Sequence, residues 1–560
     1  MPLAVATIDA DASNLLRDCL TVCCTSRCPL SRRESFFMFV SWSSSLNTLS
    51  ARFGDRPAAI DMAGESLSFR QLCTYAHALA SYLNRGDHLP GKAIASLLPN
   101  SVQAVWASYG IRMNGAAETP LSWGYTLDEI QWCAKLAGFD SVITKKERED
   151  ELRSIGLQTI DIDTLAASPE FKTLHSPLRT LPAIAGDQAG RILFTSGTTG
   201  KPKGVRYSHA ARWMGEQLLK AEMPFIPSAG EQILLMTPFV HGASLLTYAW
   251  CDFGGTIIIH PGVHTDRIEP LLNSNSLSAI FAPPTVLAKI TSAFEGRHFD
   301  GIKCVFTGTQ PLASAMYRRA AKMFGPNIRI TYGKSECVNP IAVLDRAQTQ
   351  RYFDRDHIEP GACVGWPAPG VEIKIVHPPA DASVSAEPTA NQQEDGEIYL
   401  RSPHISSGLI TETGFAPHAP EGWHQTGDLG HFDQEGRLVL TGRVADVIKT
   451  GGYRVNPDEI EAQLAHNTLC AQICVTSIAS DYWGEIIIAV AEGEKPGWED
   501  LCGDLLKDMS KHKRPRHFIG VESLPRNPQG KISRKQVARQ VLERFELRDG
   551  PYPELIKKAL

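Results

Sequence analysis

The stretch Ile192-Leu-Phe-Thr-Ser-Gly-Thr-Thr-Gly-Lys-Pro-Lys-Gly-Val205 places an apolar strand directly before a loop of glycine, hydroxyl and lysine residues. Glycines let the backbone approach a polyphosphate closely, and successive N–H groups can form a nest for an anion. Hydroxyl and lysine side chains add donors and positive charge. The spacing fits neither the G-x-x-x-x-G-K-[ST] loop nor the G-x-G-x-x-G loop. We interpret it as a nucleotide-phosphate loop; the alternative is a solvated loop, which rarely combines these features.

The composition limits the class of protein. The chain has 560 residues, of which 43% are hydrophobic and 21% charged, so it should form two or more domains. The net charge of −5 gives no basic excess, so neither nucleic acid nor an acidic membrane is an expected partner. No apolar run is long enough to span a membrane.

Cysteine usage points to an intracellular enzyme. Thirteen scattered cysteines fit free thiols better than a disulfide framework, and the cytoplasm is the expected compartment. Cys19, Cys23, Cys24 and Cys28 lie close together, but a metal site needs a second ligand pair at a suitable spacing, and none follows.

Helical and strand patterns alternate along the chain. A capping-box pattern at Ser68 and Gln71 opens a helix that we expect to end near Asn84. Strands are expected at 192–195, 256–259, 303–306 and 486–491. This alternation predicts an α/β fold with mainly parallel sheets.

Two composition changes suggest boundaries. The polar stretch 378–396 is expected to be a surface loop between strands. A sharper boundary lies near Gly442-Arg443, after which Asn456 and Pro457 form a helix start. We expect a leader over 1–40, a large domain over 41–442, a hinge over 443–447, a mobile small domain over 448–545 and a tail over 546–560.

The phosphate loop closely resembles the signature loop of the AMP-forming adenylating superfamily, which includes acyl-CoA synthetases, aryl-CoA ligases, adenylation domains and luciferases. Seven further segments follow in the family's order, and together they cover about residues 45–545. The resemblance implies a large N-terminal domain of α/β subdomains plus a small β-subdomain, joined by a hinge to a small α+β C-terminal domain. In the loop it implies phosphate contacts from Thr195, Ser196, Gly197, Thr198, Thr199, Gly200 and Lys203.

Two segments resemble the acyl gate and the adenine turn. Pro238-Phe-Val-His-Gly242 is similar to the segment that gates the acyl site, which gives His241 a catalytic role. Thr307-Gly-Thr-Gln-Pro-Leu312 resembles the adenine-contacting turn, which implies contacts from Gly308, Thr309 and Gln310. Family members often have Gly-Ala-Pro where this chain has Thr-Gln-Pro.

The next segments resemble the family's nucleotide and metal contacts. Tyr332-Gly333-Lys-Ser335-Glu336 matches the Tyr-Gly-x-Thr-Glu motif, with Tyr332 stacking on adenine. Glu336, together with the Thr198 hydroxyl, would hold Mg²⁺, which prefers carboxylate and phosphate oxygen. Gly396-Glu-Ile-Tyr-Leu resembles a structural strand motif. Thr426-Gly-Asp428 resembles the ribose-binding triplet. Asp428 suits that role because a carboxylate can accept hydrogen bonds from both ribose hydroxyls.

The last two segments resemble the moving parts of the family. In Gly442–Val455, Arg443 and Lys449 would reach the nucleotide, Ala445 would be the pivot, and Gly451 and Gly452 would border the pantetheine tunnel. Pro525-Arg-Asn-Pro-Gln-Gly-Lys531-Ile-Ser-Arg resembles the catalytic-lysine loop. We expect Lys531 to bridge the carboxylate and the phosphate during adenylation, then withdraw as the small domain rotates.

The implied activity is ATP- and Mg²⁺-dependent formation of an acyl-adenylate, followed by transfer of the acyl group to coenzyme A. The acyl pocket would be lined by Val240, Ala243, Phe306, Thr307, Gly308, Val338 and Asn339. No acidic residue occurs from Thr237 to Trp250, so an aryl or medium-chain aliphatic acid is favoured over an amino acid. Two alternatives remain: a ligase that loads a separate carrier protein, and a non-catalytic protein that binds an acyl-nucleotide.

Overall fold

The computed structural model describes residues 39–86, 90–174, 181, 184–195, 202–240, 244–338, 340–355, 361–377, 393–419, 422–526 and 531–558, without the side chain of Arg454. The cysteine cluster at 19–28 lies outside these residues. A short sheet pairs β1 (Phe39–Val40) with β8 (Ile184–Ala185). No helix within the described ranges is long and apolar enough to cross a membrane.

An eight-stranded sheet carries the phosphate loop. Its order is β21-β20-β10-β9-β5-β4-β6-β7, and β9, β5, β4, β6 and β7 run parallel. The strands are β4 (Ala93–Leu97), β5 (Ala117–Leu121), β6 (Ser141–Thr144), β7 (Gln158–Asp161), β9 (Ala189–Thr195), β10 (Lys203–Ser208), β20 (Gly408–Thr411) and β21 (Gly414–Pro417).

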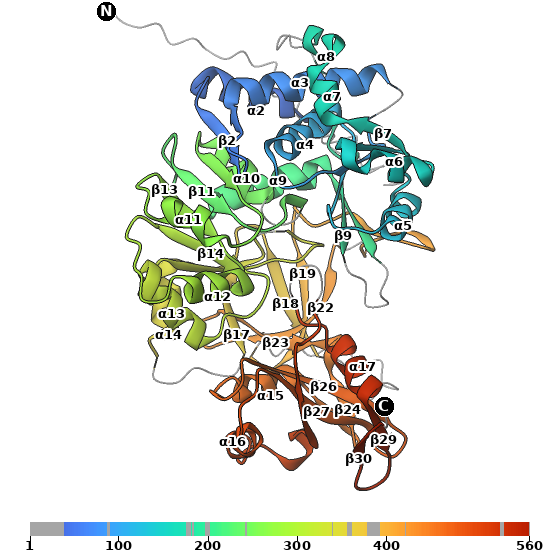
Figure 1. Cartoon of the computed structure of the whole chain (residues 1–560), viewed down its shortest axis with the longest axis vertical. Helices are drawn as coiled ribbons and strands as arrows, with labels where there is room; N and C mark the ends of the chain where they lie inside the picture. The colour runs from blue at the N-terminus through green and yellow to red at the C-terminus, as the bar shows by residue number, and fades with distance from the viewer. Residues whose placement is uncertain are drawn as a thin grey trace, which may run out of the picture. The chain divides into compact units, whose positions relative to one another are not determined.

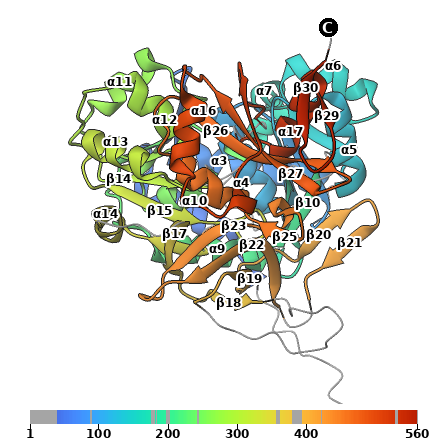
Figure 2. The same ribbon diagram turned by 90° about the horizontal axis from the view of Figure 1, so that it is seen from below.

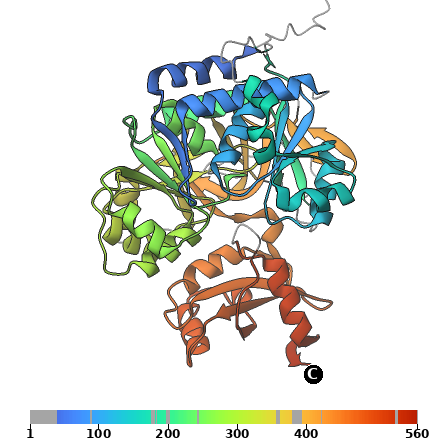
Figure 3. The same ribbon diagram turned by 45° about the horizontal axis from the view of Figure 1, so that its top comes forward.

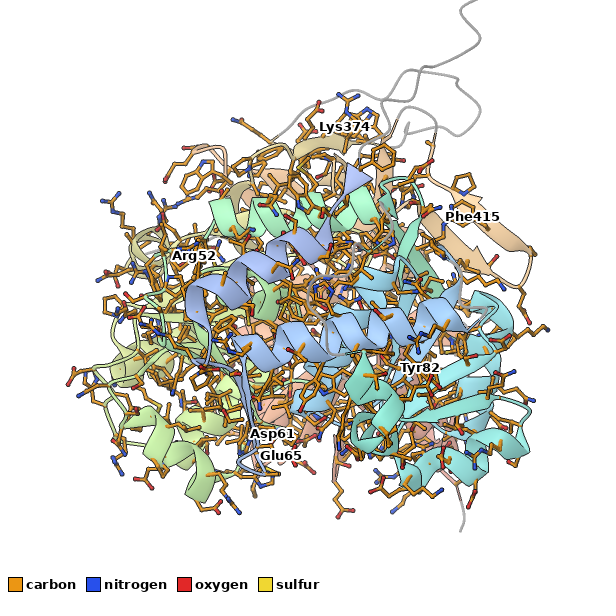
Figure 4. The ribbon with its side chains drawn as sticks, turned by 90° about the horizontal axis from the view of Figure 1, so that it is seen from above. Arg52, Asp61, Glu65, Tyr82, Lys374 and Phe415 are labelled. Atoms are coloured by element: carbon orange, nitrogen blue, oxygen red, sulfur yellow. The ribbon has the colours of Figure 1, made fainter. Side chains whose placement is uncertain are left out.

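Most of the helices next to these strands in the chain begin at a capping side chain. In α3 (Phe69–Arg85) both hydrogen bonds of the Ser68–Gln71 capping box are present, which confirms the expected start. The others are α4 (Val102–Asn114), α5 (Leu127–Ala137), α6 (Lys146–Ser154), α7 (Ile162–Ala167) and α8 (Pro169–Thr173). At the outer edge of the sheet, hairpin β20–β21 carries Phe415, which Figure 4 labels. The guanidinium carbon of Arg206, on β10, lies 3.7 Å from the centroid of that ring.

A thirteen-stranded sheet holds the other motifs, in the order β18-β19-β22-β23-β17-β16-β15-β14-β13-β11-β12-β2-β3. The run from β15 to β2 is parallel, and the remaining strands pair antiparallel. The parallel part consists of β2 (Pro57–Asp61), β11 (Gln232–Leu235), β12 (Thr256–Ile259), β13 (Leu277–Phe281), β14 (Cys304–Gly308) and β15 (Ile328–Tyr332). The antiparallel strands are β3 (Ser66–Ser68), β16 (Ala342–Leu344), β17 (Ala362–Pro367), β18 (Glu372–Val376), β19 (Gly396–Arg401), β22 (His424–Phe432) and β23 (Leu438–Arg443).

The other helices that precede β17 in the chain are α2 (Trp42–Phe53), α9 (His209–Ala221), α10 (Ser244–Asp252), α11 (Thr265–Leu272), α12 (Pro284–Ala293), α13 (Ser314–Phe324) and α14 (Arg346–Phe353). Helices α11–α14 lie beside strands β11–β15 (Figure 1). A large apolar core of leucine, isoleucine and phenylalanine side chains joins them. Most of the predicted 378–396 loop lies outside the described residues, between β18 and β19.

The C-terminal elements form a group of their own, joined to β23 by the 3₁₀ turn Val444–Asp446 (Figure 3). They are β24 (Ile448–Thr450), β25 (Tyr453–Val455), α15 (Pro457–Leu464), β26 (Gln472–Ser480), β27 (Gly484–Glu492), α16 (Trp498–Leu505), β28 (His517–Val521), α17 (Arg534–Arg544), β29 (Phe545–Arg548) and β30 (Glu554–Lys557). The residues expected to be a tail thus form a hairpin, and Asp549 of its turn accepts hydrogen bonds from Ser480 and Asp481.

The α/β fold with mainly parallel sheets, a β-subdomain and a small α+β domain is therefore confirmed. Strands 256–259 and 486–491 appear as β12 and part of β27, and Asn456 caps α15 with Pro457 in its first turn.

A buried charge network crosses the interior near α9. Arg212 and Arg191 face Glu118 of β5, and Arg112 of α4 pairs with Glu216, all with less than a tenth of each side chain exposed. Burial alone would raise the pKa of Glu118, but the facing guanidinium groups hold it below its ordinary value. The network replaces apolar packing with paired charges between α4, α9 and the sheet.

Candidate active site

Asp428 is the centre of the site. It lies on β22, where the antiparallel register pairs it with Arg443 of β23, so the Arg443 Nε comes within 3.2 Å of Asp428 Oδ1. Tyr332, at the end of β15, donates its hydroxyl to Asp428 Oδ2 at 2.5 Å. Burial alone would raise the pKa of this carboxyl, but Lys334 and Arg443 hold it below its ordinary value. The carboxylate is thus ionised and oriented.

Lys334 is a second cation at this carboxylate. Its Nζ donates to Asp428 Oδ2 at 2.9 Å and to the carbonyl of Thr426 at 2.7 Å. The sequence did not identify this contact: Lys334 fills the open position of the Tyr-Gly-x-Thr-Glu motif, and its only signal was a charge between two expected ligands. The hydrogen bond from the Tyr332 hydroxyl to Asp428 was not expected either, because only the ring of Tyr332 was assigned a role, stacking on adenine.

Lys531 of the C-terminal group lies within electrostatic reach of the same carboxylate. Its pKa is lowered to about 8, first by burial and then by the positive charges of Arg443 and Lys334, while Asp428 acts in the opposite direction. Lys531 comes three residues before α17, which sits on β26 of the small domain. Figure 2 shows β22 and β23 and the C-terminal elements from below. The structure thus brings Tyr332, Asp428, Arg443 and Lys531 together.

The phosphate loop is described at its two ends only. Thr195 ends β9 and Lys203 begins β10, and the antiparallel ladder makes them partners. The residues between them that were expected to contact phosphate, Ser196 to Gly200, lie outside the described residues. His241, Ala243 and Asn339 lie outside them as well.

The adenine turn has a constrained backbone. A Cβ on Gly308 would lie 2.2 Å from the carbonyl oxygen of Thr331, so only glycine fits against β15. Thr309, which is exposed, has a φ of 68°, and no other described non-glycine residue has a positive φ. Such backbone strain is frequent where a chain binds a ligand. Gln310 is half-buried beside it.

Glu336 is the carboxylate expected to bind Mg²⁺. Its backbone carbonyl accepts the Ser406 amide at 2.8 Å, which fixes the turn, and its side chain is half-buried. Within the described ranges, no three His, Cys, Asp or Glu side chains cluster as metal ligands. Mg²⁺ in phosphate-transfer sites is commonly bound by one or two carboxylates plus the substrate phosphates, so a single carboxylate suits it. Ser335, next to it, has its carbonyl held by the Tyr207 hydroxyl.

The remaining expected residues lie apart from this group. Lys449, Gly451 and Gly452 are on hairpin β24–β25, all exposed, and the Lys449 amide donates to Glu485 of β27. A Cβ on Gly451 would meet the Trp483 ring. These contacts hold the hairpin to its own domain.

A cavity of about 20 Å³ lies between β9, β10, α9 and α10. Its wall combines apolar side chains, among them Leu193, Leu219, Leu245 and Val338, with Arg191, Arg212 and Glu216 of the buried charge network. Val338 was among the expected acyl-pocket residues, and Leu245 lies in the expected segment 238–245. Val240, Phe306 and Thr307 are buried but do not line this cavity.

Comparison with known proteins agrees with this geometry. Residues 47–410 match the model of the AMP-binding enzyme family, and 459–531 match the AMP-binding enzyme C-terminal domain. The chain is 27% identical to 4-coumarate-CoA ligase 1 of Narcissus pseudonarcissus, covering 87% of this chain and 91% of that one. It is 25% identical to the long-chain-fatty-acid–CoA ligase of Bacillus subtilis, covering 90% and 95%.

The fold is also found in ATP-bound MatB from Rhodopseudomonas palustris, with a TM-score of 0.76, 22% identity and coverage of 90% and 99%. The first match spans well over half of the chain, and residues 411–458, which include Asp428 and Arg443, lie between the two matched ranges. The second match begins within α15 and ends at Lys531. The chain therefore belongs to the AMP-binding enzyme family and is an AMP-forming ligase.

Proposed function

We propose that the protein activates a carboxylic acid with ATP and Mg²⁺ to an acyl-adenylate and then transfers the acyl group to coenzyme A. The observation that supports this best is the convergence of Lys531 on Asp428 and Arg443. Adenylation needs a cation near the reacting phosphate, and Lys531 of the small domain lies within electrostatic reach of Asp428, the carboxylate expected to bind ribose. The names of two of its relatives, a 4-coumarate-CoA ligase and a long-chain-fatty-acid–CoA ligase, support the thioester product.

In the first step, an oxygen of the substrate carboxylate attacks the α-phosphorus of ATP, and the bond from that phosphorus to the pyrophosphate oxygen breaks. Negative charge grows on the phosphoryl oxygens, so positioned cations lower the barrier. Lys531 takes this role; Lys203 and His241 complete the catalytic set, at the phosphates and the acyl gate. Glu336 and Thr198 would hold Mg²⁺, which supplies further positive charge against the phosphates.

In the second step, the thiol sulfur of coenzyme A attacks the acyl carbon, AMP leaves and the thiol proton is lost. Lys531 must first withdraw to make room. The turn Val444–Asp446 joins the two parts of the chain, and Gly451 and Gly452 lie just beyond it. We assign these two glycines to the pantetheine path and Ala445 to the pivot.

The acid is proposed to be aryl or medium-chain aliphatic. The segment Thr237 to Trp250 carries no acidic residue that could bind an ammonium group, which favours such an acid over an amino acid. We place the reaction in the cytoplasm, and the described cysteines, all free thiols, are consistent with that compartment.

The test is AMP formation by the purified protein with a panel of aryl and aliphatic acids, with and without coenzyme A. We expect pyrophosphate release with at least one acid, and thioester formation only when coenzyme A is added. If acyl-adenylate accumulates and its acyl group passes only to a carrier protein, the carrier protein and not coenzyme A is the acceptor. No exchange of labelled pyrophosphate with any acid would refute adenylation.

A further inference from the structure

The Asp428 carboxylate has a limited capacity for donors, and half of it is already used. A carboxylate offers about four lone-pair positions, two on each oxygen. Oδ2 accepts from the Tyr332 hydroxyl at 2.5 Å and from Lys334 Nζ at 2.9 Å. Oδ1, which faces Arg443 Nε at 3.2 Å, has to accept the two hydroxyls of a ribose.

The two cations at Asp428 differ in how firmly they are held. The Arg443 side chain is 59% exposed, whereas the Lys334 side chain is 13% exposed. Lys334 has a second acceptor, the carbonyl of Thr426, so it bridges two residues of β22. Arg443 can leave Oδ1 when a nucleotide enters, but displacing Lys334 would break two charge-assisted hydrogen bonds in a half-buried position.

From this geometry we propose that Lys334 is a positioning residue of the nucleotide site: it holds Asp428 so that Oδ1 faces the ribose hydroxyls. The proposal rests on the adenylation chemistry proposed above. It goes beyond the matched motif, because that motif leaves the position of Lys334 open.

The charge of Lys334 has a second effect, on Lys531. Arg443, Lys334 and Asp428 are among the groups that act on Lys531, and both cations lower its pKa. Removing the positive charge of Lys334 should therefore raise the pKa of Lys531 and move the alkaline limit of adenylation to higher pH. A residue that served only to support the fold would leave that limit in place.

The test compares the affinities for ATP and 2′-deoxy-ATP, measured by calorimetry on the full chain. A hydrogen bond to a charged acceptor is worth 1.5–3 kcal/mol, so the wild type should prefer ATP by on the order of 10- to 100-fold. In Lys334→Met we expect that preference to fall below about threefold, and Lys334→Arg should recover part of it. The ratio comes from a single preparation, so partial misfolding does not distort it.

Asp428→Asn provides the matched comparison. If Lys334 acts through Asp428, adding Lys334→Met to Asp428→Asn should change the ratio no further. An unchanged ATP preference in Lys334→Met, or additive effects in the double variant, would overturn the proposal. The binding assay needs no acid. A failure to find a substrate acid would therefore count against the proposed function, whereas the ratio of ATP to 2′-deoxy-ATP affinity would still test the role of Lys334.

Discussion

Arg534 Nη1 lies 2.8 Å from Asp446 Oδ2, which ties the residue that ends the hinge turn to the first residue of α17. The same guanidinium pairs with Asp458 at 2.5 Å and with Glu461 at 2.7 Å, both on α15. Lys531 lies three residues before Arg534. The position of Lys531 therefore depends on an ion cluster that spans the hinge, α15 and α17.

Replacing Arg534 with Met should destabilise the small domain. Removing Arg534 leaves three carboxylates without their cation; because these side chains are partly exposed, we expect a cost below the roughly 3–5 kcal/mol of fully buried pairs. The measurement is hydrogen exchange over residues 448–545. Arg548→Met is the control, because Arg548 and Glu554 are both more than 60% exposed and such pairs contribute about 0–1 kcal/mol. Equal exchange in the two variants would contradict the role of Arg534.

Lys531→Ala should slow adenylation by on the order of 10²–10³, the usual loss when one preorganised donor to a developing charge is removed. Pyrophosphate exchange measures this step alone. With supplied acyl-adenylate, thioester formation should be nearly normal, because Lys531 has withdrawn by then. Lys507→Ala, an exposed lysine of the same domain, is the control. Near-normal exchange by Lys531→Ala would show that another group carries the charge.

Much of the site could be expected from the sequence because its residues fall in contiguous motifs. Asp428 and Arg443 end up as partners through the register of β22 and β23, and Thr195 and Lys203 through that of β9 and β10. A hairpin with a readable turn brings its strands together by local rules.

The sequence could not show which residues from distant segments come into contact when no motif marks the pair. Glu118 and Arg212 are 94 residues apart, and each looks like an ordinary surface charge in its own helix or strand pattern. Lys334 could be read in the motif, but its bond to Asp428 depends on where β15 ends relative to β22. Sheet order across the two halves decides both contacts, and periodicity says little about sheet order.

The pH dependence of adenylation should follow Lys531. Its pKa of about 8 means that the ammonium form, which stabilises phosphate charge, is lost as pH rises through 8. The protonated fraction falls from about nine-tenths at pH 7 to about one-tenth at pH 9. kcat/KM for pyrophosphate exchange, which reports the free enzyme, should therefore decline above pH 8. Lys531→Arg stays charged and should lack this decline; a wild-type profile that is flat to pH 10 would show that Lys531 does not titrate there.

Gly308→Ala should weaken ATP binding through the shape of the adenine turn. The new methyl group would lie 2.2 Å from the Thr331 carbonyl oxygen, which is backbone of β15 and cannot rotate away. Either β14 and β15 separate or the turn moves, and the strained Thr309 beside it loses its position. We expect the dissociation constant for ATP to rise about tenfold or more, with a loss of about 1–3 kcal/mol in stability from overpacking.

Gly503→Ala is the matched control for that substitution. Gly503 lies inside α16 with no atom within 4 Å of a built Cβ, so alanine should stabilise that helix by about 0.5–1 kcal/mol and leave ATP affinity unchanged. The two variants add the same methyl group, so the difference between them isolates the contact with Thr331. If Gly308→Ala binds ATP as tightly as Gly503→Ala does, the 307–312 turn does not hold the adenine, and the nucleotide must enter the site from another side of Tyr332.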